Sequence, residues 1–368
     1  MKKRKIMISG YYGFNNTGDE AILKGIIDSI RKKRQDLDLL VLSKYPEFTE
    51  KKYGVASISR NNFAKIAKEL NTTDVFLSGG GSLLQDVTSK KSIFYYLFLI
   101  KMAMKKSVKT MIFSQGIGPI NSPISRFFAK RILNQVDVLN VRDQKSMDTL
   151  RKLGIKREIL LTTDTVFGIN KPDLEIGRQI LKTYGLDLSK DSLGISILDW
   201  KDKGYRTLIE MTRAIKLFTQ KRDVNIIINP LYYYKDMAIS EELYKKIKSF
   251  HDKVFLIKDY GHINDYLSII GNTKAFLSIR LHGLIFASLM GSYPIGISYD
   301  PKCDGFMMEL ERKNIQKIED FDGALLAREL EEAFLSKEAN PDLMKDRLEV
   351  FYKKSEIHID KLLELVDS

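Results

Sequence analysis

The segment AFLSIRLHGLIFA, residues 275–287, joins two apolar runs and places Arg280 and His282 at their junction. The first run, residues 275–279, has the length and composition of a buried strand, and the second favours a helix that opens at His282. Open α/β folds bind ligands at the carboxyl ends of parallel strands. A fixed cation beside an imidazole at this position indicates a site for an anionic small molecule.

The same alternation of short apolar runs with helical stretches continues through the chain and is typical of βαβ units. In the first half we expect strands at residues 5–11, 39–43, 75–78, 110–114 and 138–141. In the second half we expect strands at residues 193–198, 225–229, 254–257, 275–279 and 294–298. Two such series predict an α/β protein with two Rossmann-like, doubly wound domains that face a central cleft.

A proline at the end of Asn170-Lys171-Pro172 interrupts the pattern and marks the expected linker. The predicted domains are therefore residues 1–170 and 171–340. Residues 341–368 have the pattern of an amphipathic helix. In two-domain folds of this kind such a helix often returns to the first domain.

The composition restricts the class of partner. A net charge of +13 over 368 residues favours nucleotides, phosphorylated metabolites or an anionic membrane surface. The chain has no RNP-type aromatic signature, zinc-finger spacing or basic zipper, so we expect no nucleic acid. One cysteine and four scattered histidines exclude a disulfide framework and argue against a metal held by the protein. Without a signal peptide or a run of ~20 apolar residues, we expect a cytoplasmic protein.

The first predicted strand leads into SGYYGFNNTGDE, residues 9–20, followed by a helix that we expect to begin near Ala21. The spacing is not Gly-x-Gly-x-x-Gly, so the dinucleotide fingerprint fails. A ligand-binding loop and a tight strand–helix turn with acidic helix-capping residues both explain these residues. We expect exposed aromatic rings at Tyr12 and Phe14, which favours ligand contact. The candidate contacts in this loop are Tyr12, Phe14, Asn16, Thr17 and Asp19.

Two further glycine-rich turns follow predicted strands, at residues 78–82 and 115–118. Consecutive glycines lose much conformational entropy on folding, which favours a bare backbone surface for a sugar or phosphate. A cramped crossing between sheet and helix is the alternative. The candidate binding residues are Gly79, Gly80, Gly81, Ser82, Gln115 and Gly116.

Charged residues follow two more predicted strands. Arg142 comes directly after residues 138–141 and can bind a carboxylate or phosphate through two nitrogens. The alternative is a surface pair of Arg142 with Asp143 that caps the next helix. Asp300 and Lys302 follow the strand predicted at 294–298 and add a carboxylate and an ammonium group.

An aromatic and aliphatic run at residues 92–104 is flanked by lysines. It is too short to span a bilayer. A buried crossover helix and an interfacial helix on an anionic membrane surface both explain it.

Together, and in this order, these motifs resemble the polysaccharide pyruvyltransferases. The motifs are GYYGF at 10–14, NTGDEA at 16–21, GGGSLLQD at 79–86, QGIGP at 115–119, VRD at 141–143, RLH at 280–282 and YDPK at 299–302. The likeness is greatest to bacterial enzymes that place a pyruvate ketal on N-acetylmannosamine of secondary cell-wall polymers. Asn15 and Gly283 depart from the family, which often has glycine and alanine there, and this leaves the acceptor preference open.

The resemblance implies a GT-B-like architecture and a transferase of cell-wall polysaccharide biosynthesis. It implies phosphoenolpyruvate as co-substrate, no cofactor, and a lipid-linked saccharide acceptor at the inner face of the cell membrane. It also implies that Arg142 and Arg280 neutralise the carboxylate and phosphate of phosphoenolpyruvate while His282 acts as general acid or base. Tyr12 and Phe14 would stack on the acceptor sugar.

Two other functions remain compatible with the sequence. A glycosyltransferase of the same fold would bind a nucleotide sugar and needs a carboxylate for the ribose, which Asp300 or Glu309 could supply. A non-catalytic scaffold for envelope synthesis would tolerate His282→Ala, whereas an enzyme would lose nearly all activity.

Overall fold

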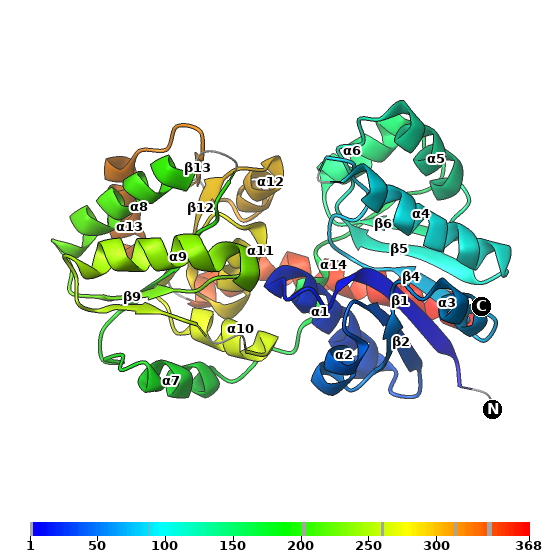
Figure 1. Cartoon of the computed structure of the whole chain (residues 1–368), viewed down its shortest axis with the longest axis horizontal. Coiled ribbons are helices and arrows are strands. Elements are labelled where there is room, and N and C mark those ends of the chain that lie inside the picture. The colour runs from blue at the N-terminus through cyan, green and yellow to red at the C-terminus, as the bar shows by residue number, and fades with distance from the viewer. Residues whose placement is uncertain (1–2, 88, 201–203, 259–260, 313–314, 337–340) are drawn as a thin grey trace. The chain divides into compact units, whose positions relative to one another are not determined.

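The structure is a computed structural model that describes residues 3–87, 89–200, 204–258, 261–312, 315–336 and 341–368. The chain forms two units (Figure 1). Unit 1 comprises Met1–Asn170 and Val350–Ser368, and unit 2 comprises Lys171–Glu349. Each unit has a parallel sheet with its own hydrophobic core. The predicted pair of parallel-sheet α/β domains is confirmed.

Unit 1 is built on a seven-stranded sheet with the order β3-β2-β1-β4-β5-β6-β7, in the part of the chain that the structure describes. Its strands are β1 (Lys5–Tyr12), β2 (Asp38–Ser43), β3 (Ala56–Ser59), β4 (Val75–Ser78), β5 (Lys109–Gln115), β6 (Val138–Val141) and β7 (Leu160–Leu161). Its helices are α1 (Thr17–Lys33), α2 (Pro46–Tyr53), α3 (Phe63–Leu70), α4 (Lys90–Lys105), α5 (Pro123–Leu133), α6 (Gln144–Leu153), the 3-10 helix η1 (Thr165–Gly168) and the end of α14 (Pro341–Asp367).

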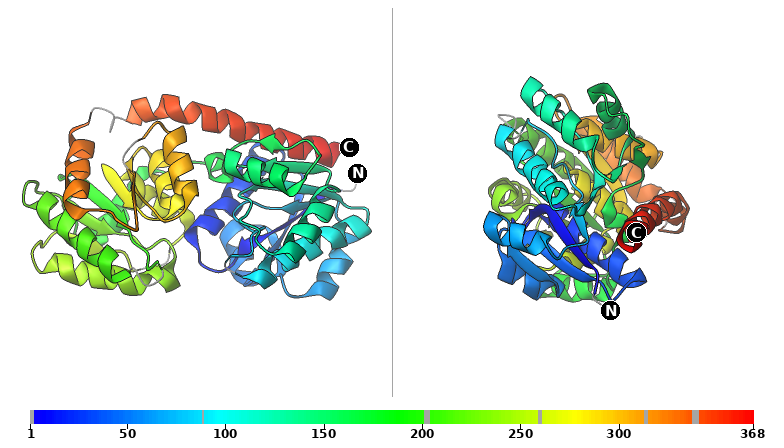
Figure 2. Two further views of the ribbon diagram at one scale, coloured as in Figure 1. Left: turned by 90° about the horizontal axis from the view of Figure 1, so that it is seen from above. Right: turned by 90° about the vertical axis from the view of Figure 1, so that its right-hand side faces the viewer.

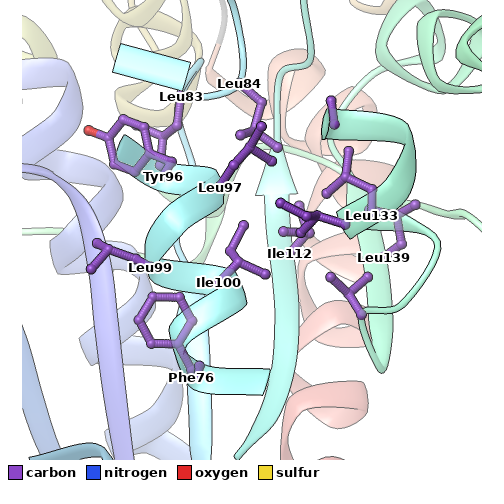
Figure 3. Close-up of a cluster of buried hydrophobic side chains, with 14 of the residues drawn as sticks. Phe76, Leu83, Leu84, Tyr96, Leu97, Leu99, Ile100, Ile112, Leu133 and Leu139 are labelled. Atoms are coloured by element: carbon purple, nitrogen blue, oxygen red, sulfur yellow. The ribbon is translucent and has the colours of Figure 1, made fainter. Parts of the chain in front are cut away.

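The main core of unit 1 lies between the sheet and helices α3 to α6. Figure 3 shows part of it, with Tyr96, Leu97 and Ile100 of α4 in the same cluster as Phe76 of β4 and Ile112 of β5. These side chains are all at most 2% exposed. Helix α4 is therefore a crossover helix with one face in the core.

The part of the last helix, α14, from Val350 onward belongs to unit 1 and packs on it (Figure 2). The Phe351 ring stacks on Phe167 of η1 with 4.8 Å between ring centroids. Asp360 pairs with Lys33 at the end of α1, with 2.5 Å between Nζ and Oδ1. The buried His358 ring lies 4.7 Å from the Phe113 ring of β5. An apolar face and a set of ion pairs thus attach the end of the chain to unit 1.

Unit 2 is built on a six-stranded sheet with the order β10-β9-β8-β11-β12-β13, again within the described residues. Its strands are β8 (Ser192–Ser196), β9 (Asn225–Ile228), β10 (Val254–Leu256), β11 (Ala275–Ser278), β12 (Tyr293–Ser298) and β13 (Ile315–Lys317). Its helices are α7 (Leu174–Thr183), α8 (Gly204–Thr219), α9 (Tyr233–Lys248), α10 (Ile263–Gly271), α11 (Leu281–Met290), α12 (Pro301–Glu309) and α13 (Gly323–Leu335). Helices α8, α9 and α13 contribute to its main core, and α7 and α10 enclose a smaller cluster.

The expected strands are all present, and three short strands, β3, β7 and β13, were not predicted. All three are edge strands, each paired with only one other strand, so they need fewer apolar residues than the central strands do. The first helix begins at Thr17 rather than near Ala21, because the Asn16 side chain accepts a hydrogen bond from Gly18 N and caps the helix. Among the described helices, none is both long and apolar enough to cross a bilayer.

Candidate functional site

Arg280 is the N-cap residue of α11, two residues after β11 ends. The Ser278 hydroxyl accepts a hydrogen bond from Arg280 N at 3.1 Å and donates one to Arg280 O at 2.9 Å. Gly283 lies against this serine, and a Cβ at that position would be 2.1 Å from Ser278 Oγ. The glycine therefore allows the serine to hold the turn that presents Arg280 at the carboxyl edge of the unit 2 sheet.

The Arg280 guanidinium is held by Asp236 of α9. Its Nε donates to Asp236 Oδ2 at 2.6 Å, and Nη2 donates to Oδ1. Asp236 is 1% exposed and also accepts a hydrogen bond from Tyr232 N. This bidentate pair fixes the plane of the guanidinium.

His282, Asp300 and Lys302 lie at the same edge of the unit 2 sheet as Arg280. His282 is in the first turn of α11, half-buried, with its ring 6.0 Å from the Phe286 ring. Strand β12 pairs in parallel with β11, so the residues that follow both strands share one edge. Asp300 caps α12 by accepting from Lys302 N at 3.0 Å. An imidazole and two cationic side chains at two helix N-termini suit anion binding and proton transfer.

Tyr299 borders the same edge and contacts the Trp200 ring at a tilt of 51°, with 4.5 Å between centroids. Burial raises the pKa of Tyr299 to about 12, an effect that nearby Cys303 adds to and Arg280 opposes. The phenol therefore stays protonated and can donate a hydrogen bond.

Arg142 in unit 1 is also paired with a buried carboxylate. Its Nη1 donates to Asp164 Oδ2 at 2.5 Å, and both side chains are about one-twentieth exposed. Asp143 is a more distant partner at 3.6 Å and caps α6 by accepting from Ser146 N. The alternative of a surface pair with Asp143 is wrong, because Arg142 is buried and its main partner is Asp164, which follows the unpredicted strand β7. Anion binding by Arg142 stays a prediction. Its Nη2 lies 3.4 Å from Ser82 Oγ.

Close packing in the glycine-rich turns of unit 1 leaves no room for side chains at the glycine positions. A Cβ at Gly79 would be 2.3 Å from Tyr12 Oη, and one at Gly80 would be 2.9 Å from Ile22 Cγ2. At Gly116 a Cβ would approach Arg142 Nη2 and Ser82 Oγ to 3.0 Å. Gly116 therefore leaves room for the contact between that arginine and serine.

Several candidates in these turns are buried and serve the local structure. The Gln115 side chain is fully buried and donates to the backbone oxygens of Ser78 and Gly79. Gly81 has a φ of +91°, which favours glycine. Thr17 is 0% exposed, and Asp19 accepts from Asn16 Nδ2 at 2.6 Å.

The expectation of an exposed ring at Tyr12 is wrong. Tyr12 is 0% exposed and packs against Gly10 and Gly79. Its neighbour Tyr11 is half-buried instead and stacks on Phe14, with ring centroids 3.9 Å apart and planes 4° from parallel. The partly exposed aromatic rings of this loop are therefore those of Tyr11 and Phe14.

The sequence did not single out three residues that the structure brings to these edges: Asp164, Asp236 and Arg60. Arg60 follows β3 directly, as Arg142 follows β6, so a correct prediction of β3 would have drawn attention to it. No pattern near Asp236 distinguishes it from other acidic residues on helix surfaces. Within the described residues, no group of three or more His, Cys, Asp or Glu side chains is arranged to hold a metal ion.

The family model for polysaccharide pyruvyl transferases matches residues 16–301 of the chain. The amylovoran biosynthesis protein AmsJ of Erwinia amylovora is 20% identical over 390 residues, with 88% of this chain and 91% of that protein covered.

Similar solved structures share the fold at low identity. A putative UDP-N-acetylglucosamine 2-epimerase from Listeria monocytogenes has a TM-score of 0.68 at 12% identity, with 98% of this chain and 95% of that chain covered. The UDP-GlcNAc 2-epimerase of Methanocaldococcus jannaschii has a TM-score of 0.67 at 15% identity, with 99% of both chains covered. A glycosyltransferase from Rickettsia africae has a TM-score of 0.65 at 11% identity, with 100% and 98% covered.

These neighbours have the GT-B-like fold, which confirms the predicted architecture of two parallel-sheet domains. They show the fold alone, because identity is low. The family match covers most of the chain and includes Arg142, Arg280 and His282; of the first loop it includes only the residues from Asn16 onward. The chain therefore belongs to the polysaccharide pyruvyl transferase family and is a transferase.

Proposed function

We propose that the chain transfers the pyruvyl group of phosphoenolpyruvate to a sugar of a polysaccharide precursor and forms a pyruvate ketal. The observation that carries this proposal is the set Arg280, His282 and Lys302 at one edge of unit 2 in a chain of this family. Phosphoenolpyruvate has a carboxylate, a phosphate and a methylene group that must gain a proton. The set provides a guanidinium, an ammonium group and an imidazole, which can accept and donate protons.

The reaction needs balanced proton transfers. Protonation of the methylene carbon makes C2 electrophilic, and a sugar hydroxyl adds to C2 and loses its proton. The C2–O bond to phosphate then breaks, and a second hydroxyl adds and loses its proton. The two protons released by the hydroxyls balance those taken up by the methylene carbon and the departing phosphate. His282 can serve both directions as general acid and general base.

The cationic side chains have distinct tasks in this proposal. Arg280, fixed by Asp236, binds the donor carboxylate or phosphate with its remaining N–H groups. Lys302 stabilises the charge on the departing phosphate. In unit 1, Arg142 is a further anion-binding group, oriented by Asp164.

We take the acceptor to be a lipid-linked saccharide, with N-acetylmannosamine of a secondary cell-wall polymer precursor as the sugar. The family resemblance supports this choice, and the relative AmsJ is named for the biosynthesis of amylovoran. The stacked rings of Tyr11 and Phe14 are suited to pack on a sugar face.

A lipid-linked acceptor places the enzyme at the inner membrane face, and unit 1 has a surface that suits this location. We define the aromatic surface as five phenylalanines of α3, α4 and α5 that are 36–58% exposed: Phe63, Phe94, Phe98, Phe127 and Phe128. Their rings are linked in pairs, with centroids 5.5 Å apart for Phe63–Phe98 and 6.1 Å for Phe94–Phe128.

The charged residues of α4 and α5 beside the aromatic surface are all basic. The described sequence of α4 and α5 contains lysines and arginines but no acidic residue. Lys91, Lys105, Arg126 and Lys130 of these helices are exposed. Aromatic rings with a basic border favour the interface of a membrane that contains anionic lipids.

The experiment that tests the donor is thermal unfolding of the full chain with phosphoenolpyruvate and, separately, with UDP- and GDP-sugars. A ligand that binds only the native state raises the melting temperature. We expect a rise with phosphoenolpyruvate that Lys302→Met reduces. A rise with a nucleotide sugar alone would instead support a glycosyltransferase.

A further inference from the structure

Arg60 is a buried arginine at the carboxyl edge of the unit 1 sheet. It follows β3 and is 9% exposed. Its backbone is held on both sides, since Arg60 N donates to Ser43 O at 2.9 Å and Tyr95 Oη donates to Arg60 O at 2.8 Å. The position of its side chain is therefore set by the sheet and by α4.

Four aromatic rings surround the Arg60 guanidinium. The central carbon lies 4.5 Å from the ring centroid of Tyr95 and 5.6 Å from that of Tyr96, both of α4. It lies 5.2 Å from the Phe14 centroid and 5.9 Å from that of Tyr11. Cation–π contacts of this kind stabilise a buried guanidinium without removing its net charge.

The polar contacts of Arg60 leave most of its donors available. Nη1 donates to Gly10 O at 3.3 Å and Nη2 to Tyr96 Oη at 3.4 Å, both long hydrogen bonds. A guanidinium has five N–H donors. Among the described residues, no carboxylate is paired with Arg60, whereas Arg142 and Arg280 each have a buried aspartate. Arg60 therefore keeps a full positive charge beside the proposed acceptor loop.

A buried cation without a counter-charge is costly, and an anion that binds there offsets that cost. The surroundings of Arg60 indicate which anion. On one side lie Tyr11 and Phe14, which we propose for the sugar. On the other side the Tyr95 ring is 6.1 Å from the Phe63 ring, which belongs to the aromatic surface. In a lipid-linked saccharide, phosphate groups stand between the sugar and the lipid.

We propose that Arg60 binds the phosphate group that joins the acceptor sugar to its lipid. The inference rests on the proposed function for the identity of the acceptor, while the anion site itself rests on the contacts of Arg60. A planar guanidinium held by stacked rings binds phosphate oxygens through paired N–H groups. The phosphate of phosphoenolpyruvate has the same chemistry, so the test separates the two sources.

The test measures the melting temperature of the full chain against the concentration of inorganic pyrophosphate and, separately, of phosphoenolpyruvate. Arg60→Met keeps an apolar side chain of similar length and removes the charge. Arg178→Met, at an exposed arginine of α7, is the control for loss of one positive charge. We expect Arg60→Met to weaken pyrophosphate binding at least tenfold, because pyrophosphate loses its paired hydrogen bonds with the Arg60 guanidinium. The phosphoenolpyruvate response should stay unchanged, because phosphoenolpyruvate does not bind at Arg60. Arg178→Met should match the wild type with both ligands.

Three results would overturn the proposal: no response of the wild type to pyrophosphate, wild-type pyrophosphate affinity in Arg60→Met, or loss of the phosphoenolpyruvate response instead. If Arg60→Met does not fold by circular dichroism, Arg60→Lys decides. This substitution keeps the positive charge but removes the paired N–H groups of the guanidinium, so we expect about tenfold weaker pyrophosphate binding. Unchanged affinity for pyrophosphate would contradict the proposal. If the wild type binds pyrophosphate through Arg60 but never responds to phosphoenolpyruvate, the proposed donor fails and the anion site stands.

Discussion

Asp236 of α9 holds the guanidinium of Arg280 through both carboxylate oxygens, with Arg280 Nε 2.6 Å from Asp236 Oδ2. The pair connects α9, which contains Asp236, to the N-terminus of α11, where Arg280 is the N-cap residue. Because the aspartate occupies one edge of the fork, an incoming anion meets an arginine whose plane is already fixed. The arrangement favours orientation of a ligand over maximum charge.

Asp236→Asn should destabilise unit 2 by about 3 kcal/mol, because it leaves a partly buried arginine without its counter-charge. Replacing both partners, as Asp236→Leu with Arg280→Met, should recover much of that loss. Urea unfolding followed by tryptophan fluorescence measures this directly, since Trp200 is the single tryptophan and lies in unit 2.

Asp252→Asn is the control for that measurement, because the Asp252 side chain is 94% exposed in its pair with Lys248. We expect no measurable change from it. Equal stability of Asp236→Asn and the wild type would show that the Arg280–Asp236 pair does not organise unit 2.

Gly283→Ala should destabilise unit 2 by about 1–3 kcal/mol, because the added Cβ would lie 2.1 Å from Ser278 Oγ. Gly305→Ala in α12 is the matched control, since no heavy atom lies within 4 Å of its added Cβ. In a helix, that change should stabilise by about 0.5–1 kcal/mol. Opposite shifts of the urea midpoint are expected, and equal shifts would contradict the packing argument.

His358 should make unit 1 less stable in acid. Burial lowers the pKa of His358 from 6.5 to about 3, with a small opposing effect of Asp164. Between these values the unfolded chain binds more protons than the folded chain, so stability is complete above pH 6.5 and falls as the pH is lowered. From pH 7 to pH 5 this group should remove about 2 kcal/mol.

His358→Gln cannot take up the proton, so its stability should fall less than that of the wild type over the same range. Urea unfolding by circular dichroism at pH 5, 7 and 8 tests this, and between pH 7 and pH 8 the two proteins should change in parallel. Equal pH dependence in the acid range would mean that His358 is protonated in the folded state.

The aromatic surface predicts binding to anionic vesicles that weakens as salt is added. Phe98→Ser combined with Phe127→Ser should reduce that binding by more than tenfold, because two exposed rings on α4 and α5 are lost. Tyr234→Ser, at a tyrosine of unit 2 that is 72% exposed, is the control and should bind as the wild type does. Co-sedimentation with neutral and with anionic vesicles measures the effect, and equal binding to both would contradict it.

The sequence predicted the buried strands because strands covered on both faces have continuous apolar runs. It did not predict β3, β7 or β13, which lie at or near the sheet edges and are only two to four residues long. Because β3 was not predicted, Arg60 was not recognised as a candidate site residue, although it lies directly after that strand.

Side-chain direction and distant pairing set the other limits. The pairing of β1 with β2 is irregular between Ser9 and Tyr12, so simple alternation does not tell which of Tyr11 and Tyr12 is buried. Asp236 is 44 residues from Arg280 in the chain and lies on a different helix. Contacts of this kind depend on how helices pack across a sheet, which no local pattern encodes.

Incubation of the purified full chain with isotope-labelled phosphoenolpyruvate and a lipid extract of bacterial membranes tests the central claim most directly. We expect the label to enter a lipid-linked saccharide as an acid-labile pyruvate ketal, with release of one phosphate for each ketal. Substitution of His282 by Ala should abolish both products while the protein stays folded. Label that stays in phosphoenolpyruvate, together with sugar transfer from a nucleotide sugar in the same extract, would contradict the account.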